Sequence, residues 1–456
     1  MYVSIILAAG EGTRMKSSVP KVLHKVCGKE MIKYIIDASK KAKIEKNIIV
    51  LGHGKEKIEK EISECAVDIV EQPIGKDVPY GTGFAVKQAI KYIKDNDTVL
   101  ILNGDVPLIK SETLKEFINY HKRGKYTASV LTAEIKDPTG YGRIVRDTEG
   151  KVMSIIEHKD ASIEEKEIRE INSGIYCFEG GKLIETLKKL DTNNSQNEYY
   201  ITDAVKILND EGFNVGGYKV KNELEIKGVN NRVQLAEIDN AMKRRINEEH
   251  MLNGVTLIDP ENIYIEKSVV IGKDTIIYPG TYLEKETEIG DNCIIGPNTR
   301  IINSKISNET TVESSKVIDS EVGCNTLIGP FAYIRPGSRI GEKVKIGDFV
   351  EVKNSSIGNN TKASHLAYIG DANIGNDVNI GCGVVFVNYD GKSKNKTIVK
   401  DKAFIGSNSN LIAPVIIDEG AYVASGSTIT NDVDKEDLAI ARARQVNKKG
   451  KGKNRF

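Results

Sequence analysis

An aliphatic residue recurs at every sixth position of this chain from Ile271 onward. An amphipathic helix repeats its apolar residues about every 3.6 positions and a half-buried strand every two, so neither produces a period of six. The period is typical of a parallel β-helix, in which each hexad forms one short strand and a turn and buries its aliphatic side chain in a stacked core. We therefore predict a prism-shaped β-helix over residues 254–456. Three unbroken runs carry the period: Ile271, Ile277, Leu283, Ile289, Ile295 and Ile301; Val322, Ile328, Ile334, Ile340, Ile346 and Val352; and Ile405, Leu411, Ile417, Val423 and Ile429.

One long interruption breaks the hexads, which otherwise continue to about residue 437. Residues 387–397 (VNYDGKSKNKT) are polar and contain a glycine, so we expect them to leave the prism as a loop, and loops on rigid scaffolds often carry function. Residues 442–455 hold seven basic side chains and no acidic one. This tail fits a solvated chain end and a binding site for a phosphorylated ligand equally well.

The first part of the chain has a different pattern. Short apolar runs at residues 3–7, 48–51, 67–70 and 98–102 alternate with amphipathic stretches such as 31–42 and 84–93, which predicts an α/β domain over residues 1–232. Apolar residues then follow at helical spacing among charged ones. We expect a single helix there, residues 233–253 and about 30 Å long, that links the α/β domain to the prism as a rigid arm. Its apolar positions are Leu235, Ile238, Met242 and Ile246.

Composition narrows the classes of function. The formal charge of +1, from 65 basic and 64 acidic residues, argues against a nucleic-acid-binding protein, which normally has a basic excess. The six cysteines are scattered and form no Cys-x-x-Cys motif, as expected of reduced intracellular thiols. The apolar run at residues 2–9 is too short to span a bilayer and lacks a basic segment before it. We expect a soluble cytoplasmic protein with no membrane insertion.

A glycine-containing turn follows the first apolar run. Gly10 and Gly12 let the backbone approach a ligand closely, and consecutive amides after a strand can bind phosphate oxygens. Met15 stands where a dinucleotide fingerprint needs a third glycine, and the lysine-serine ending of a P-loop is also absent. Arg14 and Lys21 supply the cations that a triphosphate needs. The two glycines alone would fit a plain tight turn better than a phosphate site.

The longer motif LAAGEGTRM at residues 7–15, followed by Pro20-Lys21, resembles the signature of sugar-1-phosphate nucleotidyltransferases. Asp105 ends the motif Asn103-Gly104-Asp105, which follows an apolar run at the strand end where open α/β sheets bind ligands. Gly-Asp after a strand is also ordinary turn chemistry. The functional interpretation of Asp105 is a Mg²⁺ ligand, since this ion takes a few carboxylate or amide oxygens and completes its shell with water and phosphate. By the resemblance, Asn230 is the second ligand.

With the hexads added, the whole chain resembles the bacterial family of bifunctional N-acetylglucosamine-1-phosphate uridylyltransferases and glucosamine-1-phosphate acetyltransferases. Three further motifs carry this resemblance: PTGYGRI at 138–144, IEHKDA at 156–161 and EYYITD at 198–203. It implies a Rossmann-like nucleotidyltransferase domain, a connecting helix and a left-handed parallel β-helix, assembled as a homotrimer with acetyltransferase sites at subunit interfaces. It also implies synthesis of UDP-N-acetylglucosamine, a precursor of peptidoglycan and other cell-envelope polymers.

The resemblance implies a first site that transfers UMP from UTP to N-acetylglucosamine-1-phosphate and releases pyrophosphate. Arg14 and Lys21 would be catalytic residues that act on the phosphates. Gln72, Gly81 and Thr82 would hold the uracil. Mg²⁺ would be the cofactor. Glu157 and Asn172 would hold the sugar. The full set of implied ligands of UTP and the sugar is Leu7, Ala8, Ala9, Gly10, Lys21, Gln72, Gly81, Thr82, Asn103, Gly104, Asp105, Gly142, Glu157, Asn172 and Asn230.

The resemblance implies a second site that transfers acetyl from acetyl-CoA to glucosamine-1-phosphate, with His365 as general base. A histidine that titrates near neutrality suits an amine that loses a proton as it attacks a thioester. Without this context, a lone histidine in a repeat protein is more often a surface or packing residue. The implied ligands are Arg335 and Lys353 for the sugar phosphate, Tyr368 and Asn379 for the sugar, Asn388 and Tyr389 between the sugar and acetyl-CoA, and Cys382, Ser407, Ser425 and Arg442 along the acetyl-CoA path.

Two other assignments remain open from the sequence. A single-function sugar-1-phosphate nucleotidyltransferase could carry the prism as a regulatory domain, and a non-catalytic assembly subunit could keep both folds. The residues of the second site argue against the first alternative, and the intact Arg14, Lys21 and Asp105 argue against the second. The segment 73–80 is longer than the family's usual form, which leaves the contact of Gln72 with uracil open.

Overall fold

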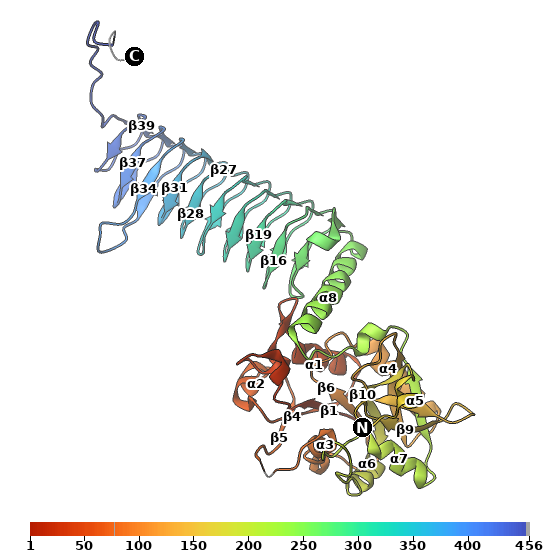
Figure 1. The fold of residues 1–456 in the computed structure, drawn as a ribbon. Coiled ribbons are helices and arrows are strands. Elements are labelled where there is room, and N and C mark those ends of the chain that lie inside the picture. Colours follow the sequence, from red (N-terminus) through yellow and green to blue (C-terminus); the bar gives the residue numbers. More distant parts are fainter. Residues whose placement is uncertain (77, 453–456) are drawn as a thin grey trace. The chain divides into compact units, whose positions relative to one another are not determined.

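The computed structural model describes residues 1–76 and 78–452, and the chain forms two compact units, Met1–Met242 and Lys243–Phe456 (Figure 1). Helix α8, Arg232–Leu252, crosses the division between them. It begins and ends one residue earlier than the predicted helix 233–253. Ile238, Met242 and Ile246 are buried as the apolar spacing predicted, while Leu235 is half-buried.

A nine-stranded sheet forms the centre of the first unit, in the order β11-β7-β10-β6-β1-β4-β5, with β8 and β9 joined to it at β10. Strands β6, β1, β4 and β5 are parallel neighbours, and β10 runs antiparallel to both β6 and β7. The four predicted strands are confirmed. The strands are β1 (Tyr2–Ala8), β4 (Lys46–Leu51), β5 (Asp68–Glu71), β6 (Thr98–Asn103), β7 (Ala128–Glu134), β8 (Arg143–Arg146), β9 (Val152–Ile156), β10 (Glu170–Glu179) and β11 (Val215–Lys219), with the hairpin β2 (Lys25–Val26) and β3 (Lys29–Glu30) apart from them.

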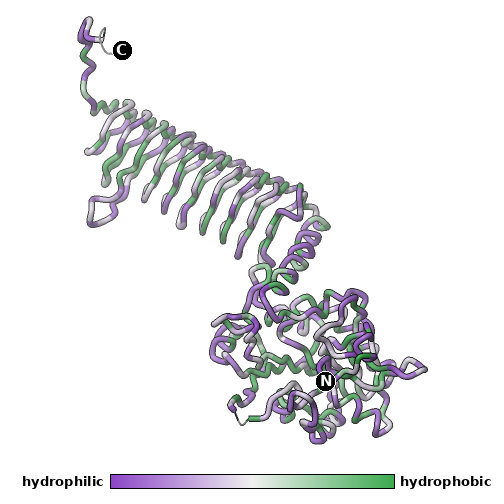
Figure 2. Tube along the Cα trace, in the orientation of Figure 1, coloured by the Kyte–Doolittle hydropathy of each residue, from purple (hydrophilic) through white to green (hydrophobic). Residues whose placement is uncertain are grey.

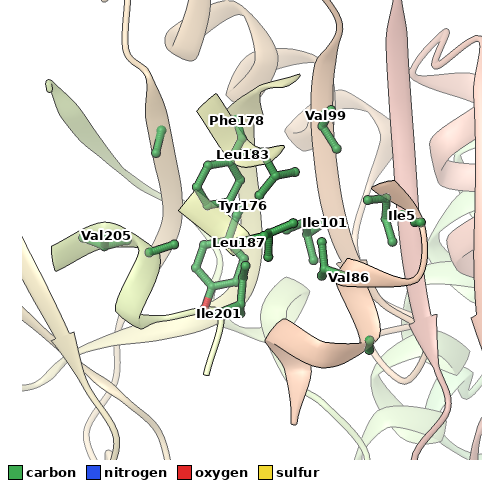
Figure 3. Close-up of a cluster of buried hydrophobic side chains, with 14 of the residues drawn as sticks. Ile5, Val86, Val99, Ile101, Tyr176, Phe178, Leu183, Leu187, Ile201 and Val205 are labelled. Atoms are coloured by element: carbon green, nitrogen blue, oxygen red, sulfur yellow. The ribbon is translucent and has the colours of Figure 1, made fainter. Parts of the chain in front are cut away.

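Helices and alternating strand residues build an apolar core on each face of this sheet. Ile5 of β1 belongs to one core cluster and Ile6 to the other, because successive side chains of a strand point to opposite faces. Figure 3 shows the first cluster, in which Leu183 and Leu187 pack against Ile101 of β6. The helices are α1 (Met31–Lys41), α2 (Lys55–Glu61), α3 (Thr82–Lys87), α4 (Ser111–Arg123), α5 (Ile163–Lys166), α6 (Gly180–Leu187) and α7 (Asp203–Asp210).

The predicted amphipathic stretch 84–93 is not one helix. Helix α3 begins earlier, at Thr82, and ends at Lys87, and the chain then continues as a 3₁₀ turn at Ile90–Tyr92. The tighter winding still buries Ala89 and Ile93 against the same core cluster. The apolar spacing therefore identified the buried face correctly but not the break in the hydrogen-bond pattern.

The second unit is a parallel β-helix with three faces. Every third strand as far as β40 belongs to the same sheet, β41 then pairs with β39, and the three sheets contain eleven, ten and nine strands. They run from β12 (Thr256–Leu257) to β41 (Leu438–Ala439), from β13 (Tyr264–Ile265) to β40 (Thr428–Ile429), and from β14 (Val270–Ile271) to β38 (Val415–Ile417). The repeat of apolar positions from coil to coil is visible in Figure 2.

The hexad residues form the core of the prism, as the period predicted. Every member of the three runs is buried except Ile271, which is half-buried. Ile271 lies in β14, the first strand of its sheet, so a stacked neighbour covers it on one side only. Burying one isoleucine or valine contributes about 1.5–3 kcal/mol, and the stacked columns repeat this gain in each coil.

The predicted loop leaves the prism between β34 (Val385–Val387) and β35 (Thr397–Val399), where Figure 1 shows it projecting from the coils. Residues 442–452 are exposed and contain no helix or strand, and the rest of the basic tail lies outside the described residues. Of the helices in the described ranges, none has the length and apolar character that crossing a membrane requires.

Candidate active sites

A cavity of about 460 Å³ lies in the first unit at the carboxyl ends of the parallel strands. β1 and β6 are neighbours with Leu7 opposite Asn103, so the loop after β1 and the motif after β6 meet at one sheet edge. The cavity wall contains nearly all of the predicted ligands of the first site: Leu7, Ala8, Ala9, Gly10, Lys21, Gln72, Gly81, Thr82, Asn103, Asp105, Gly142, Glu157, Asn172 and Asn230.

Two predicted residues, Gly104 and Arg14, do not line the wall. The Gly104 amide donates to the Leu7 carbonyl oxygen at 2.9 Å, and a Cβ at Gly104 would lie 3.0 Å from that oxygen. Gly104 therefore allows the close approach of the two strand ends. Arg14 reaches the site through its guanidinium, which donates to Asn230 Oδ1 at 2.9 Å.

Charged and amide groups gather at one end of the cavity. Lys21 Nζ lies 2.5 Å from Asp105 Oδ2 and 3.4 Å from Asn230 Oδ1. The Val229 amide also donates to the Asp105 carbonyl at 3.0 Å, which holds two distant chain segments together. The structure thus brings Asp105 and Asn230 to one cation, although sequence spacing alone gave no reason to pair them.

The donor set at this end fits a magnesium ion. One carboxylate and one amide oxygen converge on a single position, which the ammonium of Lys21 takes in this structure. Mg²⁺ prefers a few such oxygens and takes its other ligands from water and phosphate. Over residues 1–76 and 78–452, no cluster of three or more His, Cys, Asp or Glu side chains offers a more complete protein site.

Glu157 and Asn172 also line the cavity, and both lie close to Gly142. Burial, first, and the nearby carboxylates of Asp160 and Asp203 raise the pKa of Glu157, while a hydrogen bond from Thr202 opposes this shift. The Thr202 hydroxyl donates to Glu157 Oε1 at 3.4 Å. Asn172 is also buried, and its backbone N–H donates to the Gly142 carbonyl oxygen at 2.9 Å.

Several wall residues were not predicted. Tyr80 and Tyr176 line the cavity, as do Glu198 and Thr202. Glu198 and Thr202 belong to the EYYITD motif. The sequence analysis used this motif for the resemblance but assigned it no role, although the motif could have identified these two wall residues. Tyr80 ends the longer segment 73–80, whose Asp77 lies outside the described residues. Gln72 itself is buried and lines the cavity.

The second set of predicted residues lies on the prism, around His365 at the end of β30 (Lys362–His365). Its Nδ1 lies 2.6 Å from Oδ1 of Asp348, which occupies the opposite position on β27 (Lys345–Asp348) in the preceding coil. This hydrogen bond, first among the causes, lowers the pKa of Asp348. An ionised carboxylate only accepts, so Nδ1 carries the hydrogen and Nε2 of the neutral ring is the free acceptor. The sequence analysis missed Asp348.

The predicted sugar-phosphate ligands each pair with a carboxylate that was also missed. Arg335 donates to Glu351 Oε1 at 2.6 Å, and Lys353 Nζ donates to Asp371 Oδ2 at 3.1 Å. Asn388, from the loop, donates to the same oxygen of Asp371 at 2.5 Å. The buried Asp371 thereby ties the loop to the strand that carries Lys353.

Other predicted residues of the second site lie close to this group. Asn388 Nδ2 also donates to the Tyr368 hydroxyl at 3.4 Å, while the Tyr389 hydroxyl bonds within the loop to the Gly391 carbonyl at 2.8 Å. Lys394, an unpredicted loop residue, pairs with Tyr389 across the loop. The neighbouring ammonium of Lys353 lowers the pKa of Lys394. A surplus of positive charge therefore collects where the sugar phosphate was expected.

The predicted acetyl-CoA residues stack along successive coils. The Cys382 carbonyl accepts from the Asn408 amide at 2.7 Å, and the Ser407 carbonyl accepts from the Gly426 amide at 2.8 Å. A Cβ at Gly426, which follows Ser425, would lie 3.9 Å from the Arg442 side chain. Asn379 lies in register with Lys362 of β30, on the sheet that carries His365. The column thus continues from the His365 coil toward the C-terminal end of the prism.

Comparison with known proteins agrees with both halves of the chain. A family model described as nucleotidyl transferase matches residues 3–223, and one described as bacterial transferase hexapeptide (six repeats) matches residues 268–303 and 319–354. The relative "Bifunctional protein GlmU" of Clostridioides difficile (strain 630) is 56% identical, covering 98% of this chain and 97% of its own. The chain belongs to the GlmU family.

Other GlmU relatives are nearly as similar. Those of Alkaliphilus metalliredigens and Clostridium novyi are 55% and 53% identical and cover 98% and 99% of this chain, and 97% and 98% of their own. Membership in the GlmU family confirms the predicted fold class and the predicted bifunctional transferase, which combines uridylyl transfer with acetyl transfer. It also favours this assignment over a regulatory prism or a non-catalytic subunit. A crystal structure of UDP-glucose pyrophosphorylase with UDP-glucose covers 54% of this chain and 99% of its own at 18% identity, and its TM-score of 0.45 is too low to add to the argument.

Proposed function

We propose that the two residue clusters described above carry the two activities, and that together they make UDP-N-acetylglucosamine. The prism acetylates glucosamine-1-phosphate with acetyl-CoA, and the first unit joins the product to UMP from UTP. The observation that carries this proposal is the set of groups that share the cavity. Cationic and metal-binding groups, as a triphosphate requires, contact one another in it, and the hydrogen-bonding side chains of Glu157 and Asn172 line the same cavity.

Uridylyl transfer at the cavity needs positioning more than acid–base chemistry. The sugar phosphate has a second pKa near ~6, so it is already an anionic nucleophile at neutral pH and needs no general base. One of its oxygens attacks the α-phosphorus of UTP, and the bond from that phosphorus to the departing pyrophosphate breaks. Arg14 and Lys21 neutralise the phosphate charges, and Glu157 and Asn172 hold the sugar so that the attacking oxygen is aligned.

A divalent cation is generally required for nucleotidyl transfer, and we propose Mg²⁺ at Asp105 and Asn230. The bound ion would neutralise charge on the phosphates. Lys21 contacts both of these oxygens in the structure, so it must release them to the ion and is then free to contact a phosphate.

Acetyl transfer on the prism uses the imidazole of His365. The amine of glucosamine-1-phosphate attacks the thioester carbon, its proton passes to His365 Nε2, and the carbon–sulfur bond breaks to release CoA. Asp348 holds Nδ1 at 2.6 Å and so keeps Nε2 toward the substrate. Arg335 and Lys353, together with Lys394, bind the sugar phosphate.

Three finer points complete the proposal. The residues of the second site lie on an open face of one chain, with His365 59% and Tyr389 57% exposed, so we propose a homotrimer in which neighbouring copies complete each site. The partners are the small-molecule substrates, with no nucleic acid. We place the enzyme in the cytoplasm, in agreement with six cysteines that are all thiols.

The test supplies glucosamine-1-phosphate, acetyl-CoA and UTP together and measures UDP-N-acetylglucosamine. We expect product only when acetyl-CoA is present. Asp105→Ala should abolish uridylyl transfer and keep acetyl transfer, because it removes the carboxylate ligand of the metal. His365→Ala should do the reverse. Near-normal uridylyl transfer by Asp105→Ala at saturating Mg²⁺ would contradict the metal site, and equal loss of both activities in either variant would indicate misfolding.

A further inference from the structure

A buried tyrosine ends at the sugar side of the cavity. Tyr176, in β10, is 1% exposed, and its ring packs among Leu183, Leu187 and Ile201, as Figure 3 shows. Tyr176 nevertheless lines the cavity, and its hydroxyl lies 2.7 Å from Nδ2 of Asn172, another lining residue. No motif or resemblance pointed to this residue.

A bulge in β10 brings these two side chains together. In an unbroken strand, residues four apart are separated by roughly 13 Å. Here Asn172 pairs with Thr132 and Tyr176 with Val130, so β10 carries two more residues than β7 over this stretch. Gly174 inside the bulge has a φ of +75°, a conformation that favours glycine. The fold therefore creates a contact that strand geometry would otherwise forbid.

The hydrogen bonds around Asn172 allow only one orientation of its amide. The Gly174 backbone N–H donates to Asn172 Oδ1 at 3.0 Å, and a backbone N–H can only donate. The opposite edge of the amide must then be Nδ2, which donates to the Tyr176 oxygen. Tyr176 accepts this bond, so its own hydrogen is available to a different acceptor.

The chemical state of Tyr176 supports this arrangement. Burial, first, and the negative charge of Glu157 raise the pKa of Tyr176, so the phenol keeps its hydrogen throughout the neutral range. The groups expected to meet the sugar then include the second Nδ2–H of Asn172 as a donor and Glu157 as an acceptor. A neutral sugar with hydroxyl and carbonyl oxygens can satisfy both kinds of group.

We propose that Tyr176 is a positioning residue for the sugar phosphate, because it holds the Asn172 amide with one N–H directed at the bound sugar. This inference rests on the proposed function of the cavity and adds a residue to it. The effect belongs to the sugar end alone, since the nucleotide contacts come from β1, β6 and the segment around Gln72.

Tyr176→Phe tests the proposal because it removes only the hydroxyl. The loss of one hydrogen bond should raise the KM for N-acetylglucosamine-1-phosphate about three- to tenfold. The KM for UTP and the acetyl-transfer rate should not change. The double variant with Tyr176→Phe and Asn172→Ala should have the same sugar KM as Asn172→Ala alone. The reason is that Asn172→Ala already removes the amide that Tyr176 holds. Tyr34→Phe is the matched control, as it removes a buried hydroxyl that donates to the Val26 carbonyl.

An unchanged sugar KM in a folded Tyr176→Phe protein would overturn the proposal. It would also be overturned if Tyr176→Phe raised the sugar KM by the same factor in the wild-type protein and in Asn172→Ala. If Tyr176→Phe does not fold, Asn172→Asp gives the same test. It still accepts from Gly174 but donates to neither Tyr176 nor the sugar, so it should raise the sugar KM selectively, and an unchanged value would again overturn the proposal. A wild-type protein that forms no UDP-N-acetylglucosamine would instead contradict the proposed function.

Discussion

Glu157 illustrates at the scale of a residue how binding competes with stability. The carboxyl lies in the cavity and accepts a hydrogen bond from Thr202 at 3.4 Å, and burial raises its pKa. A raised pKa means that the folded protein disfavours the charged form. Below the ordinary value of 4.5 the group is protonated in both the folded and the unfolded state, so it costs nothing there. As the pH rises through the folded pKa, the cost in folding free energy appears and remains at neutral pH.

We therefore expect Glu157→Gln to raise the thermal midpoint of the empty protein at neutral pH. The gain should disappear as the pH is lowered toward the ordinary carboxyl pKa, and thermal melts across this range measure it. The same variant should weaken sugar binding by about 10–100-fold, because it replaces a charged acceptor by a neutral one. A lower midpoint at neutral pH would contradict the cost assigned to Glu157.

At the scale of elements, the pairing of β27 with β30 creates the His365 site. Asp348 and His365 occupy opposite positions of these two strands. The preceding pair, Gly347 and Ser364, makes the coils approach so closely that a Cβ at Gly347 would lie 2.0 Å from the Ser364 carbonyl oxygen. A backbone atom cannot move aside as a flexible side chain could, so the two strands would have to separate.

Gly347→Ala should therefore disturb the contact of Asp348 with His365 without touching either side chain. A shift of about 1 Å in a catalytic group can cost roughly a hundredfold in rate, and we expect a loss of acetyl transfer of this order. Uridylyl transfer in the same protein is the internal control and should not change. Full acetyl transfer by Gly347→Ala would show that the close approach of the strands is dispensable.

At the scale of the whole molecule, the chain combines two units with separate cores and separate sites. The predicted residues of the first site line a cavity, whereas the prism offers His365 on an exposed surface. Apolar side chains also stand exposed next to the His365 site, with Phe349 59% and Leu366 56% exposed. Removing such a surface from water is favourable, and a second copy of the prism would do so.

Sedimentation should accordingly give a species of three times the 50.2 kDa chain mass. Dilution to the monomer should reduce acetyl transfer first and leave uridylyl transfer intact, because only the exposed site depends on a neighbour. A monomer that retains full acetyl transfer would exclude the shared site.

The hexad period and the strand patterns determined the fold from the sequence alone, because the repeat of apolar residues dictates which side chains are buried whatever their distant neighbours are. Motifs and the family resemblance supplied many residues of the cavity wall, but not Tyr80 or Tyr176. The tertiary structure decided which side chains contact each other in the two sites. Strand register placed Asp348 on His365, and a bulge placed Tyr176 on Asn172. These contacts depend on hydrogen bonds between separate strands or on local breaks in a strand, and neither leaves a period in the sequence.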